Sequence, residues 1–132
     1  MARCPHQVLD SAGMKLSDFG VIEFHEAFAG QVLANVNALN SQKFYDDFLG
    51  GQEKKGAIDF EKFNTMGGSL SIGHPFGATG GRLVTTVANR LIREDKQFGI
   101  TAACADMDGS TRAGTDGGPW AHWNQLKSIR IP

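Results

Sequence analysis

The sequence predicts an α/β fold, because short strand-like segments alternate with segments of helical periodicity. Residues 19–24 and 98–105 are short and apolar, with branched, aromatic or small side chains, which is typical of buried strands. Between them, apolar residues recur at helical spacing over 25–40 and 82–94. Because this alternation is characteristic of a sheet with helices packed on it, we expect at least two sheet strands.

The composition is that of one globular domain and argues against several function classes. The chain has 132 residues and a formal net charge of −1, so it offers no basic surface for nucleic acid or an anionic membrane. No apolar run approaches the ~20 residues that span a bilayer. Two cysteines, Cys4 and Cys104, are too few for a disulfide framework and suit a reducing compartment. We expect no metal site, because Ala29 stands where an HExxH motif beginning at His25 needs its second histidine.

The first third of the chain predicts a helix, a strand and a second helix. Residues 8–14 form the first helix, and residues 15–18 form a polar connector before the strand at 19–24. The second helix begins at His25 or Glu26. Its apolar stripe consists of Phe28, Val32, Val36 and Leu39.

The middle of the chain is less regular and leads into a glycine-rich loop. Residues 44–49 predict a short helix that ends at Gly50-Gly51, and residues 52–56 predict a charged, exposed turn. Six of the fifteen residues in the loop at 67–81 are glycines, and His74-Pro75 lies in its centre. Glycine is needed where a backbone takes positive φ or lies close to another group.

The loop opens a helix and is followed by the second strand. Within the loop, residues 69–72 predict a short extended piece, and Thr79 predicts a cap for the helix at 82–94. A loop of this kind presents free N–H groups and the positive end of the helix dipole. The buried face of the helix consists of Leu83, Val84, Val87 and Leu91. The strand at 98–105 ends in Cys104.

The sequence changes character after Ala105. Residues 106–118 show no apolar period, which indicates loop or disorder. Residues 119–126 contain both tryptophans and predict an isolated docked patch or a short helix. We therefore expect a domain at 1–105, a fold that is incomplete after Ala105, and a divergent Gly/Asp-rich tail at 106–132 that is loop-like or disordered.

Three reactive side chains lie at the ends of predicted elements: His25 after the first strand, His74 in the glycine loop, and Cys104 at the end of the last strand. Sites in open α/β sheets form beyond the carboxyl ends of strands, where His25 and Cys104 lie. Histidine and cysteine titrate near ~6.5 and ~8.5, so both exchange protons near neutrality. Simpler interpretations remain open: Cys104 as a small buried apolar residue, His25 as a helix-start residue, and His74 as a surface histidine in a turn.

Three motifs resemble those of the thiolase family. His25-Glu-Ala-Phe28 resembles the Asn/His-Glu-Ala-Phe motif, and residues 67–80 resemble the Gly-His-Pro loop. The strand at 98–105 resembles the one that contains the second active cysteine of the family. The resemblance covers about residues 8–105, corresponds only to the C-terminal part of a thiolase, and is greatest to the 3-ketoacyl-CoA thiolases of fatty-acid β-oxidation in mitochondria and bacteria.

The resemblance implies the C-terminal half of a thiolase fold, a mixed sheet with helices on both faces, and acyl transfer to coenzyme A (acetyl-CoA C-acyltransferase activity). By resemblance, His74 activates a thiol and donates to a thioester oxyanion, and His25 helps to hold a water there. Cys104 moves the proton at the substrate α-carbon or on the leaving group. The implied channel for coenzyme A consists of Ala27, Phe28, Gly73 and Gly77. Coenzyme A is then a substrate, and no cofactor or metal is bound.

The sequence also departs from the family pattern. It contains no counterpart of the N-terminal half with the acylated cysteine, and Cys4 is a poor substitute. Cys104 is followed by Ala-Asp-Met-Asp108 where the family has a glycine-rich turn, and two carboxylates there would repel an oxyanion. The divergent tail takes the place of the final family strand. We therefore expect the isolated chain to be inactive, which leaves open whether it is an enzyme on its own.

The resemblance also implies partners and a location. We expect acyl-CoA and coenzyme A as ligands, a thiolase-type homo- or hetero-oligomer if the missing half is supplied, no nucleic acid, and membrane association only through a complex. The location implied is the mitochondrial matrix, although no presequence is visible, or the cytoplasm of a bacterium.

Two other functions remain open. The chain can be a non-catalytic module that pairs with a complete thiolase. A thiolase buries these sheet and helix surfaces against its other half, so in isolation they would be exposed and would bind other proteins. Alternatively, Gly77-Ala-Thr-Gly-Gly81 resembles a dinucleotide loop of an oxidoreductase, although it lacks the spacing G-x-G-x-x-G.

Overall fold

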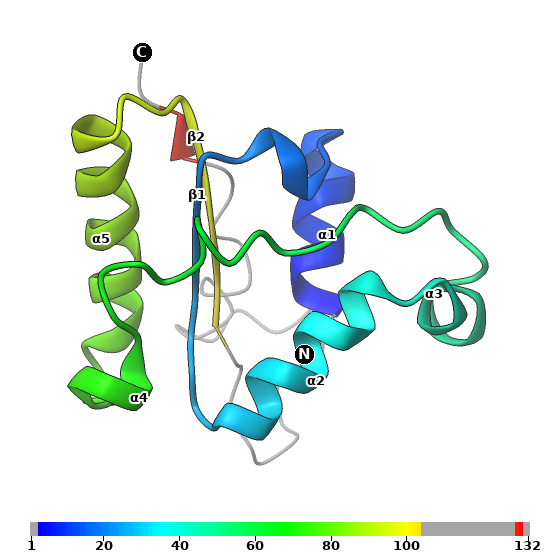
Figure 1. Cartoon of the computed structure of the whole chain (residues 1–132), viewed down its shortest axis with the longest axis horizontal. Helices are drawn as coiled ribbons and strands as arrows, with labels where there is room; N and C mark the ends of the chain where they lie inside the picture. Colours follow the sequence, from blue (N-terminus) through cyan, green and yellow to red (C-terminus); the bar gives the residue numbers. More distant parts are fainter. Residues whose placement is uncertain (1–2, 104–128, 131–132) are drawn as a thin grey trace, which may run out of the picture.

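The protein is built on a three-stranded sheet with the order β1-β2-β3 (Figure 1). The structure, a computed structural model, describes residues 3–103 and 129–130. β1 (Val21–Phe24) and β2 (Phe98–Ala102) run parallel. β3 (Ile129–Arg130) pairs antiparallel with β2 and lies inside the tail that the sequence predicts as loop or disorder. The prediction of at least two strands is confirmed, and that of an unstructured tail is wrong at these two residues.

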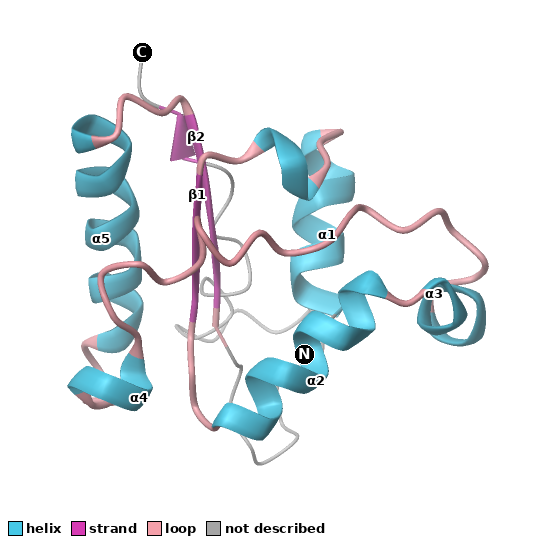
Figure 2. Ribbon diagram, viewed as in Figure 1, coloured by secondary structure: helices cyan, strands magenta, loops and turns pink. Residues whose placement is uncertain are grey.

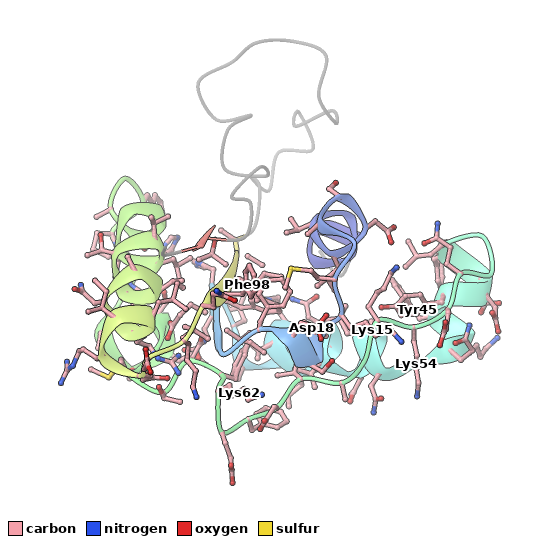
Figure 3. All side chains as sticks on the ribbon, turned by 90° about the horizontal axis from the view of Figure 1, so that it is seen from above. Lys15, Asp18, Tyr45, Lys54, Lys62 and Phe98 are labelled. Carbon is pink, nitrogen blue, oxygen red and sulfur yellow. The ribbon has the colours of Figure 1, made fainter. Side chains whose placement is uncertain are left out.

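Helices cover both faces of the sheet, as the predicted fold class requires (Figure 2). α5 lies on one face, and α1 and α2 lie on the other. The helices are α1 (Arg3–Ala12), α2 (Ala29–Asn40), α3 (Gln42–Phe48), α4 (Ser69–Ile72) and α5 (Thr79–Arg93). The predicted polar connector is a 3₁₀ turn, η1 (Leu16–Asp18), in which Asp18 Oδ2 accepts the Lys15 N–H at 2.9 Å (Figure 3). Among the described residues, none of the helices has the length and apolar character needed to span a bilayer.

The two faces of β1 pack into separate cores. Ile22 and Phe24 join a large cluster that includes Leu9 of α1, Leu39 of α2 and Ile100 of β2. Val21 joins a smaller cluster with Val87 and Leu91 of α5. Because side chains alternate along a strand, Val21 and Glu23 both face α5. Gly99 of β2 lies against this helix too, and a Cβ there would overlap Val87.

A buried ion pair joins β1 to α5. Arg90 Nη1 donates to Glu23 Oε1 at 2.8 Å, and the two side chains are only 4% and 0% exposed. Arg90 also donates to Glu94 at 2.6 Å and to the carbonyl of Lys62 at 3.1 Å. Burial raises the pKa of Glu23, and the hydrogen bond and charge of Arg90 oppose that rise. The pair therefore fixes α5 against the sheet in one orientation.

The predicted start of the second helix is wrong by several residues. α2 begins at Ala29, and Phe28 in front of it is 64% exposed, so Phe28 is not part of the buried stripe. The reason is that the strand pairing continues beyond β1: the His25 N–H donates to the Ala102 carbonyl at 2.7 Å. The helical spacing of apolar residues gives no information about this competing hydrogen bond in the sheet.

Two predictions for the glycine loop are also wrong. Residues 69–72 form helix α4 instead of an extended piece, because Glu26 accepts the Leu70 N–H at the start of that turn. Thr79 is not a cap: the N-cap of α5 is Ala78. The Thr79 hydroxyl instead donates to the Pro75 carbonyl at 3.2 Å. The predicted buried face of α5 is confirmed at Leu83, Val87 and Leu91, and Val84 is half-buried.

Replacing Arg90 with methionine is expected to lower the free energy of unfolding by about 3–5 kcal/mol, because the Glu23 carboxylate would remain buried without its partner. Urea denaturation followed by circular dichroism measures the loss. Arg93→Gln, an exposed arginine on the same helix, should stay within about 0.5 kcal/mol of the parent. Adding Glu23→Gln to Arg90→Met should recover part of the loss. A single Arg90→Met variant as stable as the parent would contradict the assignment.

Candidate active site

Two of the predicted site residues meet at the carboxyl edge of the sheet. The rings of His25 and His74 lie with their centroids 4.1 Å apart and their planes at 88°. His25 follows β1 and is 5% exposed, whereas His74 lies in the exposed loop between α4 and α5. The fold thus forms a pair of imidazoles, one buried and one open to solvent.

The environment of His25 disfavours its charged form. Its Nε2 is buried and has no hydrogen-bond partner among the described residues. Burial is the largest cause that lowers the pKa of His25, followed by the nearby charges of His74 and Arg82, and Glu26 acts in the opposite direction. His25 is therefore held as a neutral imidazole at neutral pH.

His74 Nδ1 lies 2.6 Å from Thr79 Oγ1, and that hydroxyl also lies 3.2 Å from the Pro75 carbonyl. We assign the hydroxyl proton to the Pro75 carbonyl, and the hydroxyl oxygen then accepts from His74 Nδ1–H. Nε2 of the neutral ring then holds the lone pair, which is the state that a general base needs. The sequence prediction of Thr79 as a helix cap missed this role.

Glu26 joins the end of β1 to the glycine loop. Its Oε1 accepts from Asn64 Nδ2 at 2.6 Å, and its Oε2 accepts from the Leu70 N–H at 3.2 Å. Gly68 packs against this carboxylate so closely that a Cβ would overlap it. The sequence predicted Glu26 only as a possible first residue of the second helix. The hydrogen bond from Leu70 to Glu26 joins residues 44 positions apart, so no local sequence pattern predicts it.

Asn64 is a site-supporting residue that sequence reasoning missed. Its side chain pairs with the backbone of Phe24 in both directions, at 2.8 and 2.9 Å, as a neighbouring strand would. Its φ of +47° is a conformation that asparagine tolerates better than most residues. The only hint in the sequence is its position just before the glycines.

The predicted channel residues surround the exposed histidine loop. Ala27 is half-buried, while Phe28, Gly73 and Gly77 are exposed. A Cβ on Gly73 or Gly77 would meet open space, although the φ of +89° at Gly73 itself favours glycine. Phe76 is 88% exposed, and its ring centroid lies 5.0 Å from that of His74. The loop thus presents apolar surface beside an imidazole.

Cys104, the third predicted site residue, lies outside the described residues, and so does most of the tail. In the described part of the chain, no group of three or more His, Cys, Asp or Glu side chains could hold a metal ion.

A hollow beside α5 contains none of the predicted site residues. Its lining residues are Met66, Thr86, Asn89, Arg90, Arg93 and Glu94. Arg90 is already committed to Glu23 and Glu94. We favour the histidine pair as the site, because titratable groups converge there.

The stability of the protein is expected to increase with pH on the acid side of neutrality, through His25. Because its pKa is lower in the folded state, the unfolded chain binds more protons between that value and about 6.5, so the free energy of unfolding falls as pH drops through this window. Urea denaturation at several pH values should show a shallower slope for His25→Asn. His74→Ala should reduce the slope only partly, since it removes one of several causes. An unchanged slope in His25→Asn would refute the assignment.

Several known proteins are similar to this chain in sequence. Residues 2–114 match a family model described as "Thiolase, C-terminal domain". The chain is 54% identical over 99 residues to the human "Trifunctional enzyme subunit beta, mitochondrial", which covers 75% of this chain and 21% of that protein. It is 53% identical over 97 residues to a "3-ketoacyl-CoA thiolase" of Colwellia psychrerythraea, covering 74% of this chain and 22% of that protein.

A solved structure agrees with these relatives. The acetyl-CoA acetyltransferase of Syntrophomonas wolfei superposes with a TM-score of 0.63 at 33% identity, over 79% of this chain and 23% of that chain. The chain thus spans about a fifth of the length of the relatives that it matches. On this evidence the chain belongs to the thiolase family, and its sequence corresponds to the C-terminal domain.

Proposed function

We propose that this chain supplies the histidine-bearing part of a thiolase active site, which transfers an acyl group from 3-ketoacyl-CoA to coenzyme A. The observation that supports this most is the contact of His74 Nδ1 with Thr79 Oγ1 at 2.6 Å, beside the buried His25. With the ring proton assigned to Nδ1, the lone pair of the His74 ring lies on Nε2. The names of the relatives supply the substrate class.

In the proposed reaction, His74 Nε2 removes the proton from a cysteine thiol that is supplied outside the region described here. The thiolate attacks the 3-keto carbon, and the bond between C2 and C3 breaks to give an acyl-enzyme and the enolate of acetyl-CoA. Cys104 protonates that enolate at C2. The thiol of free coenzyme A then gives its proton to the Cys104 thiolate and attacks the thioester. The shortened acyl-CoA is released, and the enzyme cysteine leaves as a thiolate that takes its proton back from His74.

The histidine pair is suited to the negative charge that develops on oxygen. Two imidazolium rings 4.1 Å apart would repel each other, so the pair accommodates one positive charge more easily than two. With His25 held neutral, His74 is the member that accepts a proton. We propose that His25 orients a water molecule toward the thioester oxygen, and that His74 donates to the same oxygen.

The exposed surface beside His74 fits a long, thin acyl carrier. We propose that the pantetheine arm of coenzyme A passes over Ala27, Phe28, Gly73 and Gly77, where no side chain blocks the loop glycines. Coenzyme A acts as a substrate, without a metal or bound cofactor. The proposed assembly is a thiolase-type oligomer, located in the mitochondrial matrix or, for a bacterial protein, in the cytoplasm.

A second candidate function is a non-catalytic module that pairs with a complete thiolase. The exposed apolar side chains of the loop favour it, namely Leu70, Ile72 and Phe76. A dinucleotide-binding function has less support, because His74 and Thr79 bond to each other across the start of α5, where a pyrophosphate would bind.

The 132 residues alone are expected to show no thiolysis of a 3-ketoacyl-CoA, because they hold no counterpart of the acylated cysteine. Disappearance of the 3-ketoacyl absorbance with free coenzyme A measures this. Turnover by the isolated chain that His74→Ala abolishes would contradict the expectation.

The same proposal is tested in an active context by placing residues 8–103 in the Colwellia 3-ketoacyl-CoA thiolase, in exchange for the matching segment. The chimera should be active, and His74→Ala should lower its kcat/KM by about 10²–10⁴-fold. Arg93→Gln is the matched control and should leave the rate within about twofold. A chimera that keeps its rate without His74 would refute the base assignment.

Replacing Thr79 with valine in that chimera is expected to lower kcat by about tenfold, because a hydrogen bond worth about 1.4 kcal/mol no longer holds the reactive tautomer. Thr79→Ser, which keeps the hydroxyl, should retain most of the rate. Equal rates for the valine and serine variants would show that the hydroxyl does not act through His74.

A further inference from the structure

Four buried side-chain polar atoms have no hydrogen-bond partner among the described residues. They are Glu23 Oε2, His25 Nε2, Thr101 Oγ1 and Arg82 Nε. Glu23 lies on β1 and His25 follows that strand, and Thr101 is the direct partner of Glu23 on β2. Glu23 faces α5 through its bond to Arg90, and Gly99, two residues before Thr101, lies against Val87 of α5. Glu23 and Thr101 therefore lie on the face of the sheet that α5 covers, and Arg82 belongs to that helix.

We propose that Glu23, Thr101 and Arg82 form an internal water-binding site beneath the histidine pair, and that Arg82 is a positioning residue which ties the histidine loop to this site. The chemistry of the three atoms is complementary. Arg82 Nε–H is a donor, Glu23 Oε2 is an acceptor, and the Thr101 hydroxyl is both. A buried water typically makes about three hydrogen bonds to polar groups of this kind.

Arg82 links α5 to the loop that contains His74. Its Nη2 donates to Ser69 Oγ at 3.0 Å. Ser69 is buried and is the first residue of α4, which ends at Ile72, two residues before His74. A single side chain therefore connects α5 to the first residue of α4. Loss of its guanidinium would release the loop at Ser69.

The charge of Arg82 acts on Glu23 of β1 and on His25, which follows that strand. It lowers the pKa of Glu23, against the larger effect of burial, and it lowers the pKa of His25. The charged groups that face His25 in the described residues are His74 from the loop, Arg82 from α5 and the adjacent Glu26. Of these, Arg82 adds to burial and to His74 in disfavouring the charged form of His25.

The consequence for catalysis rests on the proposed function, whereas the water site and the charge effect do not. If His25 orients a water in a thiolase site, the internal site below it fixes the ring from the opposite side. An arginine with only a structural role would hold Ser69 but leave the titration of His25 unchanged. The titration of His25 therefore separates the two roles.

The experiment uses the full 132-residue chain and nuclear magnetic resonance, with no activity assay. Long-range ¹H–¹⁵N spectra follow the titration of His25 in the parent, in Arg82→Gln, in Arg82→Lys and in Arg93→Gln. We expect the midpoint of His25 to shift upward in Arg82→Gln, to stay near the parent in Arg82→Lys, which keeps the charge, and to be unchanged in the Arg93→Gln control.

A second measurement on the parent detects the water directly. We expect a magnetisation-exchange cross-peak between Arg82 Nε–H and a long-lived water, and we expect it to disappear in Arg82→Lys.

An unshifted His25 midpoint in Arg82→Gln would overturn the positioning role. Absence of the cross-peak would overturn the water site even if a substitution at Arg82 prevents folding. Both results can be obtained whether or not the chain takes part in thiolysis, so they are distinguishable from a failure of the proposed function.

Discussion

The arrangement of the site depends on the parallel pairing of β1 with β2. Parallel strands bring their carboxyl ends to one edge, and the pairing continues for one more hydrogen bond, from His25 N–H to the Ala102 carbonyl. That bond delays the start of α2 and turns the His25 ring toward the glycine loop. Without it, His25 would enter the helix, as the apolar spacing of the sequence suggests, and the two imidazoles would not meet.

Polar contacts then place the loop on this edge. Glu26 accepts one hydrogen bond from Asn64 and another from the first turn of α4, and Gly68 is small enough to lie against the carboxylate. Arg90 anchors α5 to Glu23 on the face of the sheet that α5 covers. The buried, neutral His25 and the solvent-exposed His74 are consequences of these anchors, which hold one ring inside the protein and the other at its surface.

Much of the fold could be predicted from local pattern, and the site only in part. Both main strands and α5 were predicted because their apolar periods are strong, and His25 and His74 stood out because they follow such elements. The helical α4 depends on a contact between Glu26 and Leu70, 44 residues apart, and the role of Thr79 depends on the direction of one hydroxyl. Neither contact produces a periodic pattern in the sequence, and the only sequence hint for Asn64 is its position just before the glycines. The roles of Cys104 and of residues 104–128 stay predictions.

The central claim is that His74 is a neutral imidazole with its proton on Nδ1 and a free lone pair on Nε2. The ¹⁵N chemical shifts of this ring, measured at a pH above its titration, test it most directly. The account predicts a pyrrole-like Nδ1 and a pyridine-like Nε2, with a coupling of Nδ1–H to the Thr79 hydroxyl. A ring with its proton on Nε2 would contradict the account, because the nitrogen that faces the substrate would then have no lone pair to accept a proton.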